Sequence, residues 1–462
     1  MAPNSQVPIP PLFLARMRKY LGESEFPAFE ASFNQQPRSG LRVNTLKLSA
    51  EKFKKISPFP LGENIPWCPS AFFLEGEDRP GLHPYHLAGL YYLQDPSAMS
   101  PAELIAPQPG ECVLALDDAP GWKTTQLAAL MQSEGLLVAN DIKNKRVGHL
   151  AQNVERWGAG NVVVTNESPE RLADHFGAYF DRVLVDAPCS GEGMFRKDLG
   201  AREDWSPEMV EGCAVRQKNI LHVAAKLVRP GGYLLYSTCT FAPEEDEGVI
   251  EQVLRDYPDF DVVPLPKFPG FLNARPEWID ARSSIAGGVR LFPHLLNGEG
   301  HFACLLQRKE GEPEERVKPA RGKPLSKQTL ELWRAFSAEN LAVKIPEDRL
   351  QTAGERLYLL PALVPDYGHL RLVHSGVWLG TFKKDRFEPA HPLALFLKPG
   401  QAKKVLNLSA ESPELAAYLR GESLDANTSG WTVVTVDGFP IGWGKGVQGT
   451  LKNHFPHGWM KM

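Results

Sequence analysis

Short apolar runs alternate with helical patterns through the middle of this chain, from about residue 84 to residue 308. The apolar runs lie at 112–116, 135–139, 162–165, 182–185 and 233–237, and the helical patterns lie at 124–131, 144–156, 207–228 and 244–255. Strands that alternate with helices of this length form βαβ units, which build a parallel sheet covered on both faces. We therefore expect a doubly wound α/β domain with ligands bound at the carboxyl ends of its strands.

Smaller regions flank this alternation. A helical pattern at 12–21 and a strand-like segment at 40–46 indicate a small N-terminal α+β domain. Residues 309–325 are charged and broken by Pro and Gly, which is typical of a linker. Short strand patterns at 357–360 and 377–382 indicate further α+β sequence beyond it. The predicted domains are 1–83, 84–308, 326–390 and 391–462, with a linker over 309–325.

The composition excludes several classes of protein. With 462 residues, 43% of them hydrophobic and 23% charged, the chain is predicted to be a soluble protein with a large core and several domains. It has no apolar run near the roughly 18 residues of a membrane span, and its start does not resemble a signal peptide. Six cysteines without a CxxC pair argue against disulfides and against a metal site, and they fit a reducing cytoplasm. The net charge of −4 neither indicates nor excludes nucleic-acid binding, which needs only a local basic patch.

Two of the cysteines follow apolar strands and stand among polar residues. These are Cys189 in Asp186-Ala-Pro-Cys-Ser-Gly-Glu-Gly and Cys239 in Tyr236-Ser-Thr-Cys-Thr. A lone cysteine after a strand is usually a small buried hydrophobic residue, and the other four fit that interpretation. At the carboxyl edge of a parallel sheet, however, a thiolate can attack an electrophilic ring carbon, and a second thiol can pass a proton.

Two aspartates end strands of the predicted sheet. Asp186 either caps a turn or directs a carboxylate at the donor edge of a base. Asp141 either caps the next helix or binds the ribose hydroxyls of a nucleotide-type cofactor.

The loop at 119–125 joins the first strand to its helix, where backbone N–H groups meet the polar tail of a cofactor. It contains neither G-x-G-x-x-G nor G-x-x-x-x-G-K-[ST], which argues against a NAD-type dehydrogenase and a P-loop enzyme.

The last residues, from Gly438 onward, contain no Asp or Glu. Lysines alternate there with aromatic residues such as Trp443 and Phe455, a pattern that suits phosphate contact and base stacking. An ordinary small β-barrel core explains the same pattern equally well.

With these residues in view, the chain resembles the Sun-family RNA cytosine-C5 methyltransferases, in particular the bacterial enzymes that act on 16S ribosomal RNA. The resemblance covers most of the chain. It is carried by Leu41-Arg-Val-Asn-Thr45, His83-Pro84, Tyr91 to Ala98, Asp186 to Asp198, Tyr236 to Glu245, Gly380-Thr-Phe-Lys-Lys384 and the Gly-Trp-Gly-Lys near the C-terminus.

The resemblance implies a Rossmann-like, doubly wound class I methyltransferase domain, an N-terminal RNA-binding domain and a PUA-like domain over 391–462. It implies that Cys239 adds to C6 of a flipped-out cytosine, that Cys189 assists loss of the C5 proton and enzyme release, and that Asp186 binds the base. The methyl donor is S-adenosylmethionine, and the partner is 16S rRNA or the small ribosomal subunit. We expect a monomer in the cytoplasm with no membrane and no metal partner. The residues implied in cofactor binding are Ala119, Pro120, Gly121, Lys123, Asp141, Arg146, Asn166 and Asp186.

The cofactor loop departs from the family pattern Asp-Leu-Cys/Ala-Ala-Ala-Pro-Gly-Gly-Lys. Ala115 replaces the expected acid, for which Asp117 partly substitutes, and Trp122 replaces a glycine. Asp118 adds a negative charge, and at roughly 5 Å with an effective dielectric of about 20 its repulsion of the cofactor carboxylate is on the order of 3 kcal/mol. Two alternatives therefore stay open: a non-catalytic RNA-binding protein on the same fold, and a DNA cytosine methyltransferase with Cys189 as its nucleophile.

Overall fold

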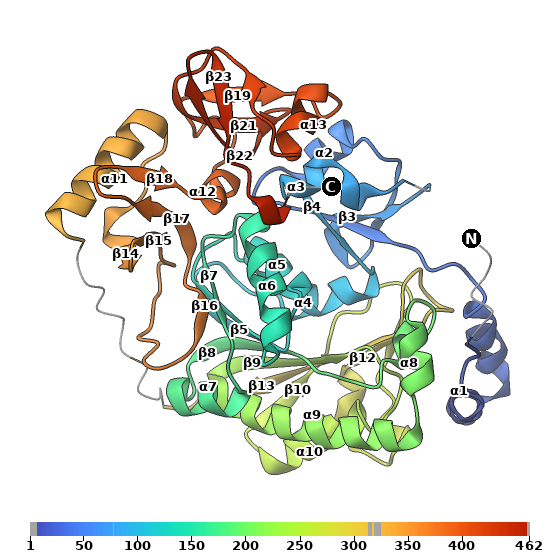
Figure 1. Ribbon diagram of the computed structural model, residues 1–462. Coiled ribbons are helices and arrows are strands. Elements are labelled where there is room, and N and C mark those ends of the chain that lie inside the picture. The colour runs from blue at the N-terminus through green and yellow to red at the C-terminus, as the bar shows by residue number, and fades with distance from the viewer. Residues whose placement is uncertain (1–6, 77, 313–316, 318–324, 460–462) are drawn as a thin grey trace.

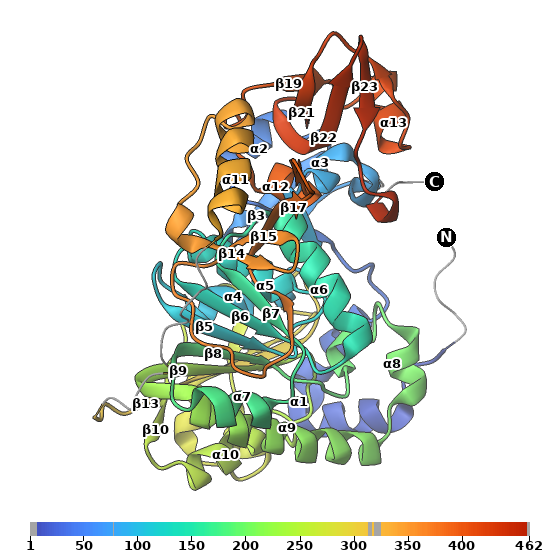
Figure 2. The same ribbon diagram turned by 60° about the vertical axis from the view of Figure 1, so that its left-hand side comes forward.

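The computed structural model describes residues 7–76, 78–312, 317 and 325–459, and most of the predicted linker lies outside these residues. The described strands form four sheets: one large central sheet, one sheet from the N-terminal region and two from the C-terminal region. Figures 1 and 2 show the two C-terminal sheets and the N-terminal sheet gathered on one side of the central sheet. Short 3-10 turns lie at Pro80–Leu82, Ser97–Met99, Glu192–Met194, Pro276–Trp278, Ser283–Gly287, Glu347–Arg349 and His457–Trp459.

The central sheet has the strand order β11-β12-β13-β9-β8-β5-β6-β7-β16, and β10 pairs with β13. Its parallel strands are β5 (Cys112–Leu116), β6 (Leu136–Asn140), β7 (Val162–Thr165), β8 (Phe180–Asp186) and β9 (Val228–Thr238). Its antiparallel strands are β10 (Phe260–Val263), β11 (Phe271–Asn273), β12 (Val289–Leu291), β13 (His301–Arg308) and β16 (Leu372–His374). The chain leaves β5 toward β6 on one side and later returns to β8 on the other. The order therefore reverses between β5 and β8, where doubly wound sheets bind ligands.

Helices cover both faces of this sheet, as the sequence predicts. On one face α4 (Ser100–Ile105), α5 (Trp122–Leu130) and α6 (Asn144–Trp157) build one hydrophobic core, and on the other α7 (Pro169–Phe176), α9 (Pro207–Leu227) and α10 (Glu247–Asp256) build a second. The parallel strands alternate their side chains between these two cores, which is why they read as continuous apolar runs. The short helix α8 (Leu199–Asp204) lies at the rim.

The N-terminal region forms an antiparallel sheet in the order β2-β3-β1-β4. Its elements are β1 (Gly40–Val43), β2 (Leu61–Ile65), β3 (Cys68–Leu74), β4 (Tyr91–Gln94), α2 (Ala50–Ile56) and α3 (Pro84–Leu87). The first helix, α1 (Pro11–Ser32), instead packs its aromatic side chains against Phe195, Trp205 and Phe241 of the central domain. The N-terminal region thus contacts the central domain from two directions.

The C-terminal region contributes two more sheets. One is β14 (Leu350–Ala353), β15 (Arg356–Leu359), β17 (Val377–Phe382) and β18 (Phe387–Pro389), with α11 (Lys327–Asn340) and α12 (His391–Phe396). The other is β19 (Val405–Leu408), β20 (Leu424–Asp425), β21 (Gly430–Val436), β22 (Phe439–Val447) and β23 (Thr450–Asn453), with α13 (Pro413–Leu419). This last sheet shares a core with the N-terminal sheet, and the Tyr85 hydroxyl donates to Asp437 at 2.9 Å between them.

One connection in the C-terminal region returns to the central sheet. Strand β16, which lies in sequence between β15 and β17, pairs antiparallel with the edge strand β7. Arg371, just before β16, extends this contact, because the Asn166 N–H donates to its carbonyl at 3.0 Å. The two regions are therefore joined through a shared sheet.

Candidate active site

The two cysteines singled out in the sequence meet at the carboxyl edge of the central sheet. Cys239 follows the end of β9, and Cys189 lies three residues beyond the end of β8. Because β8 and β9 are parallel neighbours, both ends lie at one edge, and the two Sγ atoms are 3.3 Å apart. The hydrogen bond with Cys239, together with burial, raises the pKa of Cys189, so Cys189 retains its proton.

Asp186 is the last residue of β8 and is held from two sides. Lys123 Nζ lies 2.5 Å from its Oδ2, and the Ser237 hydroxyl donates to its Oδ1 at 3.2 Å. The Lys123 side chain is only 4% exposed, whereas that of Asp186 is 30% exposed. The carboxylate is thus fixed by a buried cation and still accessible to a ligand.

A polar network beneath the thiols fixes their loops. The Ser190 N–H donates to Glu245 at 3.0 Å, and the Ser190 and Thr240 hydroxyls are 2.8 Å apart. Burial raises the pKa of Glu245 to about 7. The Gly193 N–H donates to the Cys239 carbonyl at 2.9 Å, so the loop that follows Cys189 is tied to Cys239 itself.

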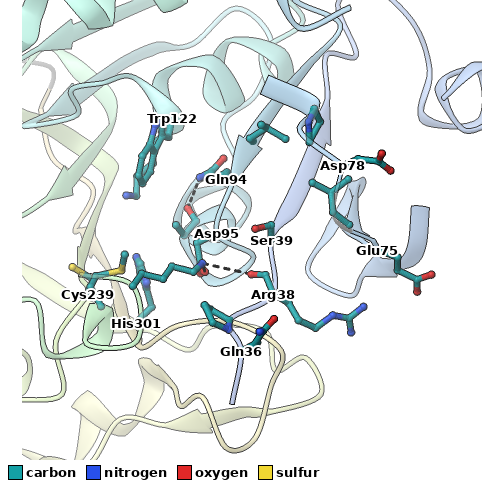
Figure 3. Close-up of a pocket in the computed structure, with 18 of the residues that line it drawn as sticks. Gln36, Arg38, Ser39, Glu75, Asp78, Gln94, Asp95, Trp122, Cys239 and His301 are labelled. Carbon is teal, nitrogen blue, oxygen red and sulfur yellow. Dashed lines mark hydrogen bonds and ion pairs between the residues drawn. The ribbon is translucent and has the colours of Figure 1, made fainter. Parts of the chain in front are cut away.

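A cavity of about 780 Å³ opens onto this arrangement (Figure 3). Its floor includes Lys123, Asp186, Cys239 and His301, and its opposite wall comes from the N-terminal region, at positions 36–39, 74–76, 78 and 80. Cys239 lines the cavity and Cys189 does not. Of the two thiols, Cys239 therefore faces the space that a substrate would occupy.

The residues implied in ribose and adenine binding lie together at the ends of β6 and β7. Asp141 is 1% exposed, accepts the Ala119 N–H at 3.2 Å and lies 3.4 Å from Arg146, which also donates to the Ala119 carbonyl. Asn166 is 4% exposed, and its amide donates to the Asp141 carbonyl at 2.8 Å. Its Oδ1 accepts from Arg371 at 3.0 Å.

The unusual loop residues have distinct surroundings. Ala115 is fully buried in β5, and Asp117 has a φ of 55° and a pKa that burial, followed by the nearby Asp141, raises to about 6. The Asp118 side chain points toward α5, the helix that follows this loop, and its carboxylate accepts a hydrogen bond from the Thr124 N–H at 2.7 Å. Its carboxylate therefore caps α5.

Trp122 begins α5 and lines the cavity (Figure 3). Its carbonyl accepts from Arg42 at 3.0 Å, which ties the loop to the N-terminal sheet. Gly121 before it has a φ of 99°, and a Cβ there would lie 2.7 Å from the Leu150 side chain, so this position requires glycine.

Three site residues escape sequence reasoning. His301 begins β13 and lines the cavity, and Lys197, 2.5 Å from the buried Asp95, lines it from another side. Arg371 reaches Asn166 from the C-terminal region. Position in the sequence gives no signal for Arg371, and the polar run Gly298-Glu-Gly-His301 stands before its strand rather than after it, so it gives no signal of the kind that identifies Cys189.

The aromatic residues from Gly438 onward were predicted either to stack on RNA bases or to form the core of a small β-barrel. Trp443 is 1% exposed and Phe455 is 4% exposed, so both belong to the core. Lys445 instead lies over the Trp431 ring, 5.4 Å from its centroid. The stacking interpretation therefore does not apply to Trp443 or Phe455.

No helix among the described residues is long and apolar enough to cross a membrane. No group of three or more His, Cys, Asp or Glu in the described part of the chain is placed to hold a metal ion.

The doubly wound sheet with acids at its strand tips is Rossmann-like. The family models that match the chain make this fold a methyltransferase with a PUA RNA-binding domain. The family model described as 16S rRNA methyltransferase RsmB/F matches residues 102–307. Models of the RsmF N-terminal domain, first C-terminal domain and PUA domain match 9–96, 335–397 and 405–461. The chain belongs to the RsmB/F family of 16S rRNA methyltransferases.

Relatives along the full length support this placement. Ribosomal RNA small subunit methyltransferase F of Shewanella sp. strain MR-7 is 33% identical over 94% of this chain and 93% of its own. The protein of the same name from Vibrio campbellii is 32% identical over 99% of this chain and 98% of its own.

Solved structures match the fold. A methyltransferase homolog protein from Pyrococcus horikoshii has a TM-score of 0.56 at 28% identity and covers 65% of this chain and 100% of its own. NSun6 from the same organism, solved with SFG, has a TM-score of 0.55 at 20% identity over 65% of this chain and 99% of its own, which bears on the fold alone.

Proposed function

We propose that this protein transfers a methyl group from S-adenosylmethionine to C5 of a cytosine in 16S rRNA through a covalent bond between Cys239 and C6. The observation that carries the proposal is the thiol pair beside the Lys123–Asp186 ion pair, with Cys239 alone of the two facing the cavity. A general RNA-binding role needs no such pair.

The residues present suit the cofactor in their chemistry. Asp141 offers carboxylate oxygens for ribose hydroxyls, and Asn166 lies beside it for adenine. The loop Ala119-Pro120-Gly121 leads into the start of α5, which offers backbone N–H groups, and Lys123 offers a cation, for the methionine carboxylate. Asp117, Asp186 and Arg146 complete the set. When bound, S-adenosylmethionine supplies an electrophilic methyl group.

Cys239 makes the first bond. Its sulfur adds to C6 while its proton moves to N3 of the ring, and the addition makes C5 electron-rich. Asp186 accepts from the exocyclic amine and stabilises the partial positive charge that the amine gains as N3 takes the proton. Lys123 holds the carboxylate in place for this contact.

Cys189 acts after C5 has taken the methyl group. Loss of the C5 proton breaks the bond between C6 and sulfur, and the thiolate that leaves takes back the N3 proton. Cys189 lies 3.3 Å from Cys239 and retains its proton, so its S–H can donate a hydrogen bond to the Cys239 sulfur and stabilise the thiolate as it leaves, while the C5 proton passes to solvent. Besides the methylated base, the products are the C5 proton and S-adenosylhomocysteine, the demethylated cofactor.

A base inside a helix cannot reach Cys239 at the cavity floor, so the target cytosine must be flipped out or unpaired. We further propose that the N-terminal region and the PUA-like region bind the flanking RNA. The domain bounds, the monomeric state and the cytoplasmic location stay predictions.

A covalent trap tests the mechanism. Purified full-length protein is incubated with S-adenosylmethionine and a 16S rRNA fragment in which 5-fluorocytidine replaces cytidine, because fluorine at C5 blocks release. We expect an adduct that survives denaturing electrophoresis, is absent in Cys239→Ala and persists in Cys213→Ala, which removes a buried cysteine of α9 outside the site. On unsubstituted RNA, Cys189→Ala should accumulate the adduct. An adduct that survives Cys239→Ala and disappears in Cys189→Ala would overturn the assignment and favour the DNA-type nucleophile.

Calorimetric titration with S-adenosylmethionine separates the enzyme from a non-catalytic RNA-binding protein. We expect micromolar binding by the unaltered chain. Absence of binding, with binding restored by Ala115→Asp, Asp117→Ala, Asp118→Ala and Trp122→Gly together, would overturn the proposal and leave an RNA-binding protein on a methyltransferase fold.

A further inference from the structure

His301 is a buried histidine at the cavity floor for which the proposed chemistry has so far given no role. It is the first residue of β13, is 5% exposed and lines the same cavity as Asp186 and Cys239 (Figure 3). Its Nδ1 is buried and has no hydrogen-bond partner among the residues that the structure describes. Buried polar atoms are nearly always paired, so an unpaired one at a cavity wall points to a ligand.

The position of His301 is fixed by the sheet and by the loop before it. Phe302 pairs with Thr238 in an antiparallel register, so the preceding position, His301, lies opposite Cys239. Gly300 donates its N–H to the Gly193 carbonyl at 3.1 Å, and a Cβ at Gly300 would lie 2.2 Å from the Phe241 ring. The imidazole is therefore held beside the nucleophile by a backbone that has little freedom to move.

The groups around His301 keep it neutral. Burial, and then the charge of Lys123, lower its pKa to about 4, against the opposing effects of Asp186 and Asp95. A neutral imidazole offers one N–H donor and one acceptor and carries no charge to repel a cationic cofactor. It thus suits recognition of a neutral base better than it suits proton transfer at neutral pH.

We propose that His301 binds the target cytosine directly, with Nδ1–H donating a hydrogen bond to the O2 carbonyl of the ring. This inference rests on the proposed function. Asp186 supplies the acceptor that the exocyclic amine needs, and in the proposed function Lys123 serves Asp186 and the methionine carboxylate, so His301 is the remaining donor for O2 on the floor. Negative charge grows on O2 as sulfur adds to C6, so this bond strengthens during the first step.

Single-turnover adduct formation on the 5-fluorocytidine RNA measures this contact. We expect His301→Leu to lower the maximal rate ten- to a hundredfold, because it removes the donor, with the RNA affinity in filter binding changed by less than about threefold. His301→Asn places an amide near the former Nδ1 and should recover at least a tenth of the wild-type rate. Thermal melts of both variants identify any rate loss caused by unfolding.

His374→Leu is the matched control. His374 is also 5% exposed, and burial likewise lowers its pKa to about 4, but it lies in β16 against Glu155, away from the cavity. We expect its adduct rate to equal that of the wild type. A His301→Leu rate equal to that of His374→Leu would overturn the inference and leave the proposed function intact, whereas no adduct in the wild type would overturn the proposed function itself.

A substrate without the exocyclic amine identifies the atom that His301 contacts. In RNA with pyrimidin-2-one at the target position, O2 is present and the amine is absent. If His301 donates to O2, His301→Leu slows adduct formation on this RNA by the same factor as on cytosine. A penalty that disappears on pyrimidin-2-one would show contact with the amine and would overturn the proposed hydrogen bond.

Discussion

Asp118 gives the sharpest test of how the altered cofactor loop is held. Its side chain is 4% exposed and accepts hydrogen bonds from both the N–H and the hydroxyl of Thr124. Burial raises its pKa from 3.8 to about 6, although Lys123 and these hydrogen bonds act in the opposite direction. The capping contact is therefore made by a carboxylate that is costly to ionise in the folded protein.

The size of that cost follows from the pKa. A rise in the pKa from 3.8 to about 6 means that ionised Asp118 lowers the free energy of unfolding by about 3 kcal/mol. The folded protein holds the proton at pH values where the unfolded chain has lost it. The free energy of unfolding therefore falls as the pH rises from about 4 to about 6, and the full cost is present at pH 8.

Asp118→Asn removes the charge and keeps an oxygen to accept from Thr124. We expect the variant to be more stable than the wild type by up to about 3 kcal/mol at pH 8, with the difference vanishing near pH 4. Urea unfolding of both proteins at pH 4, 5, 6, 7 and 8 measures this difference directly. Other titrating groups are common to both proteins and cancel.

Asp198→Asn is the control, because Asp198 is an exposed N-cap that accepts from Ala201 at 3.2 Å. Its effect should stay within about 0.5 kcal/mol at every pH. A difference between Asp118→Asn and wild type that is the same at pH 4 and pH 8, or a variant less stable at pH 8, would refute the reasoning from burial.

Three further substitutions test the scaffold of the site. Arg290→Met should lower the free energy of unfolding by about 3–5 kcal/mol in urea melts. The buried Arg290 lies 2.5 Å from Glu247 and 3.1 Å from Asp246, and both carboxylates would lose their cation. An unchanged free energy of unfolding would mean that other groups pair with these carboxylates. Gly193→Ala should abolish adduct formation and lower the free energy of unfolding by about 1–3 kcal/mol, because its Cβ would lie 2.5 Å from the Gly300 carbonyl oxygen. Gly212→Ala on α9 is the control and should change neither quantity, because a Cβ there would have no neighbour within 4 Å among the described residues beyond the adjacent backbone of its own helix. Arg371→Ala should weaken S-adenosylmethionine about tenfold in calorimetry by freeing Asn166, and unchanged affinity would show that Asn166 needs no support.

The alternation of apolar runs was enough to predict the central sheet, because strands buried on both faces must be apolar throughout. Element ends were predicted less well. The strand expected at 233–237 begins earlier, because β9 runs from Val228, which pairs with Phe180 across an irregularity in register. The helix expected from Glu244 begins at Glu247, because Glu245 is used to hold Ser190 and Asp246 to hold Thr238.

The same limit applies to the site. Cys189, Cys239 and Asp186 were predictable because each ends or directly follows a strand, and topology brings those ends together. His301 comes from an antiparallel strand that enters the site at its start rather than its end, so the rule about carboxyl ends does not find it. Arg371 depends on tertiary pairing alone, because it lies 205 positions along the chain from Asn166.

The pairing of β16 with β7 has a consequence for how the predicted domains depend on one another. β16 lies within the predicted domain 326–390, yet it completes the edge of the sheet in the predicted domain 84–308. An uncovered β7 would expose unpaired backbone groups, which sheet proteins generally avoid. The same segment carries Arg371, whose backbone and side chain hold Glu167 and Asn166. The C-terminal region therefore does more than add an RNA-binding surface, because it also closes the end of the sheet where Asp141 and Asn166 meet.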